Sequence, residues 1–253
     1  MKICAIYSIK GGVGKTATAV NLAYLSAKSG YKTLLWDLDP QGASSFYFRI
    51  KPKVKGGGKE LITGKRELDD LIKGSDFDNL DVLPADFSFR KLDIVLDARK
   101  KPTQRLHKLL EPLASEYDII FLDCPPSISL LSEAVFEAAD FLLTPLIPTT
   151  LSLRTLEQLI KFLEYKDFKK LQLIPFFSMV DKRKKMHSDS LIALSAEYPD
   201  ILKTVIPYAS DIERMGLERL PLGAYTKKST SLDAYNALWQ EILSYINTEE
   251  NTV

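Results

Sequence analysis

The chain has 253 residues, of which 45% are hydrophobic, so it is long enough to bury a full core. Lysine and arginine number 34 against 33 aspartates and glutamates, which excludes attraction to nucleic acid through overall charge. No stretch approaches the ~20 uninterrupted apolar residues of a membrane span, so we expect a cytoplasmic protein with one domain over residues 1–253.

Short apolar runs alternate with longer amphipathic segments along the chain. Strands are predicted over residues 2–8, 33–37, 80–83, 119–123, 141–146, 171–177 and 204–206. Helices are predicted over residues 15–29, 104–115, 129–139, 153–165, 188–197 and 231–246. This alternation predicts an α/β fold, a doubly wound and mostly parallel sheet with helices on both faces. Residues 49–66 hold five lysines around a triple glycine and are predicted to form a mobile surface loop.

Residues 10–16, here called the phosphate loop, read Lys-Gly-Gly-Val-Gly-Lys-Thr between the first predicted strand and helix. Glycines allow successive backbone N–H groups to point at phosphates, and the following helix adds its positive end. Lys15 is placed to contact the β- and γ-phosphates, and the Thr16 hydroxyl to ligate Mg²⁺. The sequence thus predicts a P-loop that binds nucleotide through Gly11, Gly12, Val13, Gly14, Lys15, Thr16 and Ala17.

Carboxylates follow two other predicted strands. Asp37 and Asp39 end the second strand, and Asp123 ends the apolar run 119–122 in a Walker B arrangement. Ligands of doubly wound sheets bind beyond the carboxyl ends of the strands, so these acids should face the phosphate loop. Carboxylates suit Mg²⁺, which keeps much of its own water and accepts few protein ligands. We therefore predict that Thr16 and Asp123 contribute to a metal site.

The form K-G-G-x-G-K-T resembles the deviant Walker A motif of the ParA/MinD family of dimerising ATPases. The likeness continues at residues 18–23, 138–140 and 205–207, and it is closest to the short, Soj-type ParA proteins of chromosome and plasmid partitioning. The resemblance implies slow hydrolysis of ATP with Mg²⁺, with Lys10, Lys15 and Asp39 as catalytic residues. In it, Lys10 reaches the partner's nucleotide in an ATP-dependent homodimer, Asp39 orients the attacking water and Asp37 supports the Mg²⁺ shell. The metal site that the resemblance implies is formed by Thr16, Asp37, Asp39 and Asp123.

The resemblance also implies a stimulating partner of the ParB type and a role in partitioning DNA or positioning a cargo over the nucleoid. The positions that correspond to base recognition are Met179, Asp181, Pro207 and Tyr208.

Basic residues gather in two places in the last third of the chain. Contacts with the phosphates of non-specific DNA are predicted for Lys182, Arg183, Lys184, Lys185, Arg214, Arg219, Lys227 and Lys228. The alternative is a solvated loop, and Tyr208 stands where some DNA-binding members carry arginine.

Two other classes share the same motifs. A membrane-positioning ATPase of the MinD type is expected to end in a basic amphipathic helix, which residues 247–253 do not resemble. A biosynthetic or assembly ATPase needs a second substrate pocket or paired cysteines for an iron–sulfur centre, but Cys4 and Cys124 lie in apolar strands. His107 and His187 have no ligand-spaced partner and are predicted to lie at the surface.

Overall fold

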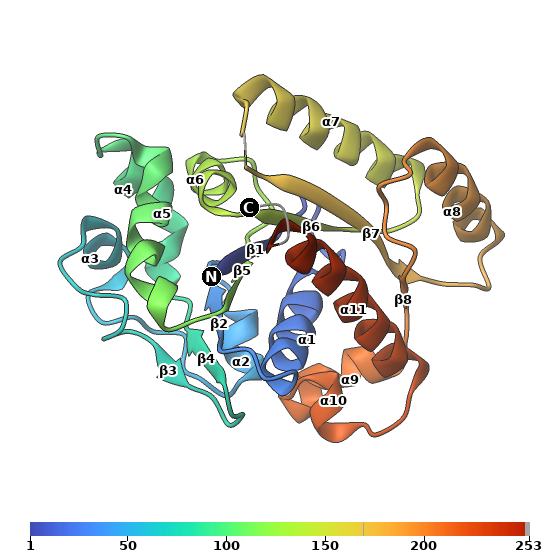
Figure 1. The fold of residues 1–253 in the computed structure, drawn as a ribbon, viewed down its shortest axis with the longest axis horizontal. Helices are drawn as coiled ribbons and strands as arrows, with labels where there is room; N and C mark the ends of the chain where they lie inside the picture. Colours follow the sequence, from blue (N-terminus) through green and yellow to red (C-terminus); the bar gives the residue numbers. More distant parts are fainter. Residues whose placement is uncertain (169, 251–253) are drawn as a thin grey trace.

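A computed structural model describes residues 1–168 and 170–250, and it contains one eight-stranded sheet. The strand order is β3-β4-β2-β5-β1-β6-β7-β8 (Figure 1). β3 is antiparallel to β4, and the other neighbours in the described sheet pair in parallel. The strands are β1 (Lys2–Ile6), β2 (Thr33–Asp37), β3 (Lys73–Gly74), β4 (Leu80–Leu83), β5 (Ile119–Asp123), β6 (Phe141–Leu146), β7 (Gln172–Val180) and β8 (Val205–Pro207).

Helices cover both faces of this sheet, as predicted. Figure 1 shows α6 (Leu130–Ala138) and α7 (Thr150–Lys166) on one side and α1 (Lys15–Lys28) and α11 (Thr230–Glu250) on the other. Further α-helices are α2 (Ala43–Tyr47), α3 (Gly57–Thr63), α4 (Leu92–Asp97), α5 (Arg105–Leu110), α8 (Lys185–Glu197), α9 (Ser210–Glu218) and α10 (Leu222–Tyr225). Short 3-10 helices span Phe87–Lys91, Pro102–Gln104 and Glu111–Ser115.

The side chains of β1 alternate between two cores, which shows why helices cover both faces of the sheet. Ile3, Ala5 and Tyr7 pack into the core beneath α6, whereas Cys4 and Ile6 pack into the core formed with α1 and α11. Successive side chains of a strand point to opposite faces, so a strand that is apolar throughout must be buried on both. Both cysteines are buried and free, as predicted.

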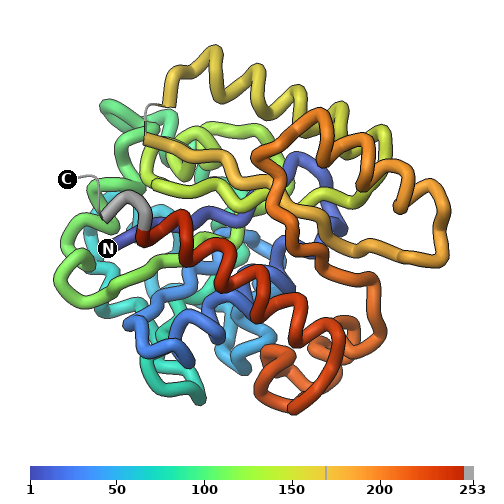
Figure 2. Tube along the Cα trace, turned by 45° about the vertical axis from the view of Figure 1, so that its right-hand side comes forward, coloured from blue at the N-terminus to red at the C-terminus, as the bar shows by residue number. Residues whose placement is uncertain are grey.

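α11 runs back across the sheet towards the start of β1 (Figure 2). Its buried side chains include Tyr235, Leu238, Trp239 and Ile242, a helical stripe that closes the core over α1. None of the helices described here is long and apolar enough to cross a membrane.

The predicted bounds of β2, β4, β5 and β6 agree with the structure. The prediction of one continuous helix over residues 104–115 is wrong. α5 ends at Leu110, and a separate 3-10 helix starts at Glu111. Pro112 has no N–H to donate, and its ring conflicts with the carbonyl one turn earlier. The short elements β3, α2, α3, α4, α9 and α10 were not predicted.

The prediction of a mobile surface loop at residues 49–66 is also wrong. The segment contains α3, and its Val54, Leu61 and Ile62 are buried in the core. A Cβ on Gly58 would lie 2.6 Å from Leu92 Cδ2 and 3.0 Å from Phe89 Cδ1, so this glycine allows the helix to pack closely. The lysines make the composition of the segment polar, although one face of its short helix is apolar and buried.

Candidate active site

The phosphate loop joins β1, the strand between β5 and β6, to α1. Gly14 is the N-cap of α1, with φ 90° and no side chain that caps the helix, and the first turn has no acidic residue. A Cβ on Gly14 would lie 2.8 Å from Ser178 Oγ, so both the backbone and the space require glycine. The first N–H groups of α1 are left for an external acceptor, which makes this helix start an anion site.

Lys15 lies inside the loop and is 7% exposed. Its Nζ donates a long hydrogen bond of 3.4 Å to the Lys10 carbonyl. Burial lowers the pKa of the Lys15 amine, and the nearby Asp123 carboxylate opposes that shift. A phosphate would supply the strong acceptor that this amine lacks here. Lys10 is half-buried at the beginning of the loop.

Asp37 and Asp123 form a buried pair opposite Lys15. They are register partners at the ends of β2 and β5, and they are 0% and 1% exposed. Asp39 lies two residues further on, is half-buried, and accepts a 3.0 Å hydrogen bond from the Gln41 N–H through Oδ1. The predicted acids therefore lie together, but only two of them are fully enclosed.

One oxygen of each buried carboxylate has no hydrogen-bond partner. These are Asp37 Oδ1 and Asp123 Oδ1, whereas both Oδ2 atoms accept hydrogen bonds from α2. Burial raises the pKa of Asp123 to about 6, and the nearby Ser44 and Thr16 hydroxyls oppose that shift. A buried charged oxygen without a donor or a cation is costly, and Mg²⁺ with its water shell would satisfy both. In the described part of the chain no three His, Cys, Asp or Glu side chains are grouped so that they could hold a metal ion by themselves.

Two serines complete this pair and were not found by sequence reasoning. Ser44 Oγ donates to Asp123 Oδ2 at 2.7 Å, and Ser45 donates to Asp37 Oδ2 through its N–H and its Oγ, both at 2.8 Å. Gly42, in a left-handed conformation with φ 68°, begins the short helix that carries them. The signal in the sequence is two adjacent serines in the loop after Asp37 and Asp39, which is weak by itself.

We expect Asp37→Asn to stabilise the protein in the absence of nucleotide and metal. Burial and, next, the Asp123 charge raise the pKa of Asp37 above its ordinary value. A carboxyl whose pKa is raised by folding loses free energy of unfolding as pH rises from its ordinary range through the folded value. Asparagine keeps the oxygen that accepts from Ser45, so thermal unfolding at pH 8 in EDTA should shift upward by roughly 2–8 °C.

Asp39→Asn is the matched control for this experiment, because Asp39 is half-buried and outside the enclosed pair. Its melting temperature should stay near that of the wild type. An unchanged or lower melting temperature for Asp37→Asn would contradict the unfavourable burial of that charge.

A hollow of about 550 Å³ lies beside the loop after β8, and Asp181, Pro207 and Tyr208 line it together with Arg183 and Glu213. Tyr208 is 49% exposed, and its hydroxyl donates to Glu213 Oε1 at 2.8 Å. Met179 is not among the lining residues; it has φ 55° and lies against Gly14 of the phosphate loop. A hollow of about 560 Å³ at the amino ends of the strands, lined by Met1, contains none of the predicted site residues.

The prediction of a surface position is wrong for His187 and right for His107, which is exposed. His187 is 4% exposed, and its Nδ1 accepts a 3.1 Å hydrogen bond from the Asp181 N–H. A polar group this buried needs a partner, and the strand end next to the hollow provides one. The first turn of α8 thereby fixes the loop that carries Asp181.

Arg183 forms a two-point ion pair with Asp181, with Nε and Nη2 at 2.8 and 2.9 Å from the carboxylate oxygens. Its guanidinium holds the pKa of Asp181 at about 2. This pair orders the start of the basic run but is open to solvent, since Arg183 is 84% exposed, so its contribution to stability is small.

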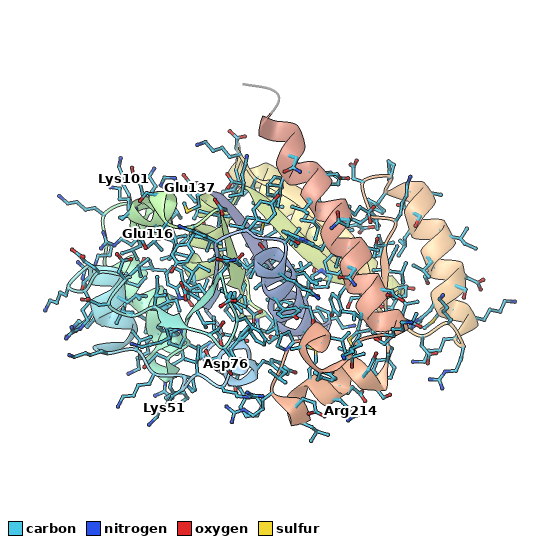
Figure 3. The ribbon with its side chains drawn as sticks, turned by 60° about the horizontal axis from the view of Figure 1, so that its bottom comes forward. Lys51, Asp76, Lys101, Glu116, Glu137 and Arg214 are labelled. Atoms are coloured by element: carbon cyan, nitrogen blue, oxygen red, sulfur yellow. The ribbon has the colours of Figure 1, made fainter. Side chains whose placement is uncertain are left out.

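The other predicted basic residues are mostly exposed. Lys182, Lys184, Lys185, Lys227 and Lys228 are open to solvent. Arg214 pairs with Glu218 at 3.1 Å and lies at the rim of the molecule in Figure 3. Arg219 is engaged: its Nε donates to the Phe46 carbonyl at 3.2 Å, and its guanidinium lies 4.4 Å from the centroid of the Phe46 ring. Arg219 is therefore a bridge to α2 rather than a free cation.

Comparison with known proteins agrees with this geometry. Residues 1–173 match the AAA_31 family model, an AAA domain. The chain is 31% identical to the sporulation initiation inhibitor protein Soj of Bacillus subtilis, with 95% of this chain and 98% of that protein covered. It is also 31% identical to the chromosome partitioning protein ParA of Myxococcus xanthus, with 96% and 88% covered.

Among solved structures, a similar fold is that of cobyrinic acid a,c-diamide synthase from Mycobacterium smegmatis with bound ADP and magnesium. The TM-score is 0.82 at 24% identity, over 98% of this chain and 96% of that one. The match to the family model covers more than half of the chain, and two relatives share nearly a third of its residues over almost the full length. The chain therefore belongs to the ParA/MinD family of deviant Walker A ATPases.

Proposed function

We propose that this protein is an ATP-dependent dimerising switch that binds ATP with Mg²⁺, hydrolyses it slowly, and partitions DNA or positions a cargo. The observation that carries the proposal is the uncapped start of α1, which faces two buried carboxylates that each keep one unpaired oxygen. The first feature suits a phosphate and the second suits the metal that accompanies it.

Each residue of the site has a separate role in phosphoryl transfer. The N–H groups at the start of α1 and the Lys15 amine bind the phosphates, and Thr16, Asp37 and Asp123 would hold the Mg²⁺ shell. Bound Mg²⁺ neutralises charge on the phosphate oxygens. Asp39, which is half-buried and hydrogen-bonded to the following loop, orients the attacking water. Lys10 contacts the nucleotide of the partner protomer.

Turnover should be slow without a partner, because this set positions groups but contains no strong general base near the phosphate loop. The relatives called Soj and ParA support a role in partitioning, and a stimulating partner of the ParB type fits that role. Similarity of fold does not distinguish a partitioning ATPase from a biosynthetic one, since cobyrinic acid a,c-diamide synthase has a similar fold at 24% identity. The relatives at 31% identity favour partitioning.

An electrophoretic shift with a short DNA duplex of arbitrary sequence tests the role on DNA. We expect a shift with ATP and Mg²⁺ at low salt, little shift with ADP, and none for Lys15→Ala, which loses the nucleotide. Contacts with ~6 phosphates would weaken binding about 10³-fold between roughly 50 and 200 mM salt. Changing Lys227 and Lys228 to alanine should lower the affinity and flatten the salt dependence.

Lys101→Ala provides the control for lost positive charge. Lys101 is exposed and lies at the edge of the molecule opposite Arg214 in Figure 3, so its removal should leave the shift unchanged. Absence of a shift at low salt, in a protein that binds ATP, would argue against partitioning on DNA.

A further inference from the structure

The side chains that hydrogen bond to the two buried carboxylates of the site lie on α2. Ser44 and Ser45 are both 0% exposed, and their hydroxyls point at Asp123 and Asp37 respectively. Serine is a poor residue for a helix interior by propensity, and a buried hydroxyl needs a partner. At these two positions the partner is in each case a carboxylate that faces the phosphate loop.

The serines determine which oxygen of each carboxylate is presented. They occupy Oδ2 of Asp37 and Oδ2 of Asp123, and the Oδ1 atoms are the ones left buried and unpaired. The terminal torsion of an aspartate is soft and roughly two-fold, so packing alone fixes it weakly. A short hydrogen bond to one oxygen fixes that torsion and directs the lone pairs of the other oxygen.

α2 is itself held from outside the site. Ser45 Oγ accepts a 2.9 Å hydrogen bond from the Ala85 N–H, which ties the helix to the end of β4. On the other side Arg219 stacks on Phe46 and donates to its carbonyl. The helix that carries the two serines is therefore held at two adjacent residues, Ser45 and Phe46.

We propose that Ser44 and Ser45 are positioning residues that orient Asp123 and Asp37 towards Mg²⁺. This inference rests on the proposed function, since it assigns roles around the same nucleotide and metal. The serines act through the carboxylates and touch neither phosphate nor metal. Their loss should weaken the response to Mg²⁺ while the phosphate loop keeps its affinity for nucleotide. Partners of metal ligands typically account for 10–100-fold in metal affinity.

The test measures binding of a fluorescent ATP analogue over a range of Mg²⁺ concentrations and again in EDTA. For Ser44→Ala we expect the Mg²⁺ concentration at half-saturation to rise about 10–100-fold, with unchanged affinity in EDTA. Ser45→Ala should have a smaller effect in the same direction, because the Ser45 N–H still donates to Asp37 Oδ2. Ser44→Thr, which keeps the hydroxyl, should restore most of the response.

Ser26→Ala is the matched control, because Ser26 is also 0% exposed and hydrogen bonds to Thr33 Oγ1 at 2.8 Å, away from the carboxylates. It should lower thermal stability without changing the Mg²⁺ requirement. A wild-type requirement in Ser44→Ala, or a parallel loss of affinity in EDTA, would overturn the positioning role alone. A wild-type protein whose nucleotide affinity does not depend on Mg²⁺ would overturn the proposed function as well.

Discussion

Replacing Asp39 with alanine is expected to reduce ATP hydrolysis about 10²-fold or more while ATP still binds and the protein still dimerises. Asp39 stands outside the enclosed Asp37–Asp123 pair, and the described hydrogen bond of its side chain is from the Gln41 N–H. Its removal should therefore leave the phosphate loop and the other predicted metal ligands in place. Phosphate release measures the rate, and calorimetric titration with ATP and Mg²⁺ measures binding.

Asp39→Asn distinguishes the charge of this side chain from its shape. Asparagine keeps an oxygen for the Gln41 N–H but removes the negative charge that would orient a water molecule. We expect a rate as low as that of Asp39→Ala. A normal rate in Asp39→Asn would assign the residue to loop geometry, and a normal rate in Asp39→Ala would move the water-orienting role elsewhere.

Lys10→Ala should abolish ATP-dependent dimerisation and leave part of the ATP binding. Lys10 is half-buried at the start of the phosphate loop, and in the proposed function Lys15 contacts the nucleotide of its own protomer. Truncating one partner of a desolvated charge pair across an interface costs about 2–5 kcal/mol of association free energy. Light scattering should report 28.5 kDa for the variant with ATP, against twice that mass for the wild type.

The measurement is best made in an Asp39→Ala background, where slow hydrolysis keeps the dimer from decaying. Lys182→Ala is a suitable control, because it removes an exposed lysine outside the phosphate loop. An undiminished dimer in the Lys10 variant would refute the role of this lysine across the interface.

Much of the fold could be predicted because parallel strands buried on both faces are continuous apolar runs. β2, β5 and β6 are such runs, and the rule that parallel strands share their carboxyl edge predicts that Asp37 and Asp123 lie together, as they do. The phosphate loop could be predicted because its glycines and lysines have a fixed order between strand and helix. Both features are determined by residues that are close together in the sequence, so a single sequence is enough to recognise them.

The features that could not be predicted depend on contacts between segments that are distant in the sequence. Ser44 and Ser45 resemble ordinary loop residues until α2 is packed against the two carboxylates. Residues 49–66 resemble a solvated loop by composition, yet three of their apolar side chains are buried in the core and Gly58 packs against Phe89 and Leu92. His187 is buried only because its α8 turn folds back on the Asp181 N–H. Tertiary packing decided each of these cases.

The place of β1 in the sheet has a consequence for synthesis. β1 is made well before β5 and β6, which are its neighbours in the sheet, and Cys4 pairs with Phe121 on one side and Phe141 on the other. At about 5–20 residues per second, roughly 6–25 s pass between the emergence of the first strand and that of its nearest partner. During that interval the N–H and C=O groups along both edges of β1 lack their strand partners, so the nascent chain is exposed to misassembly. The crevice at the phosphate loop forms only when β5 and β6 pair with β1.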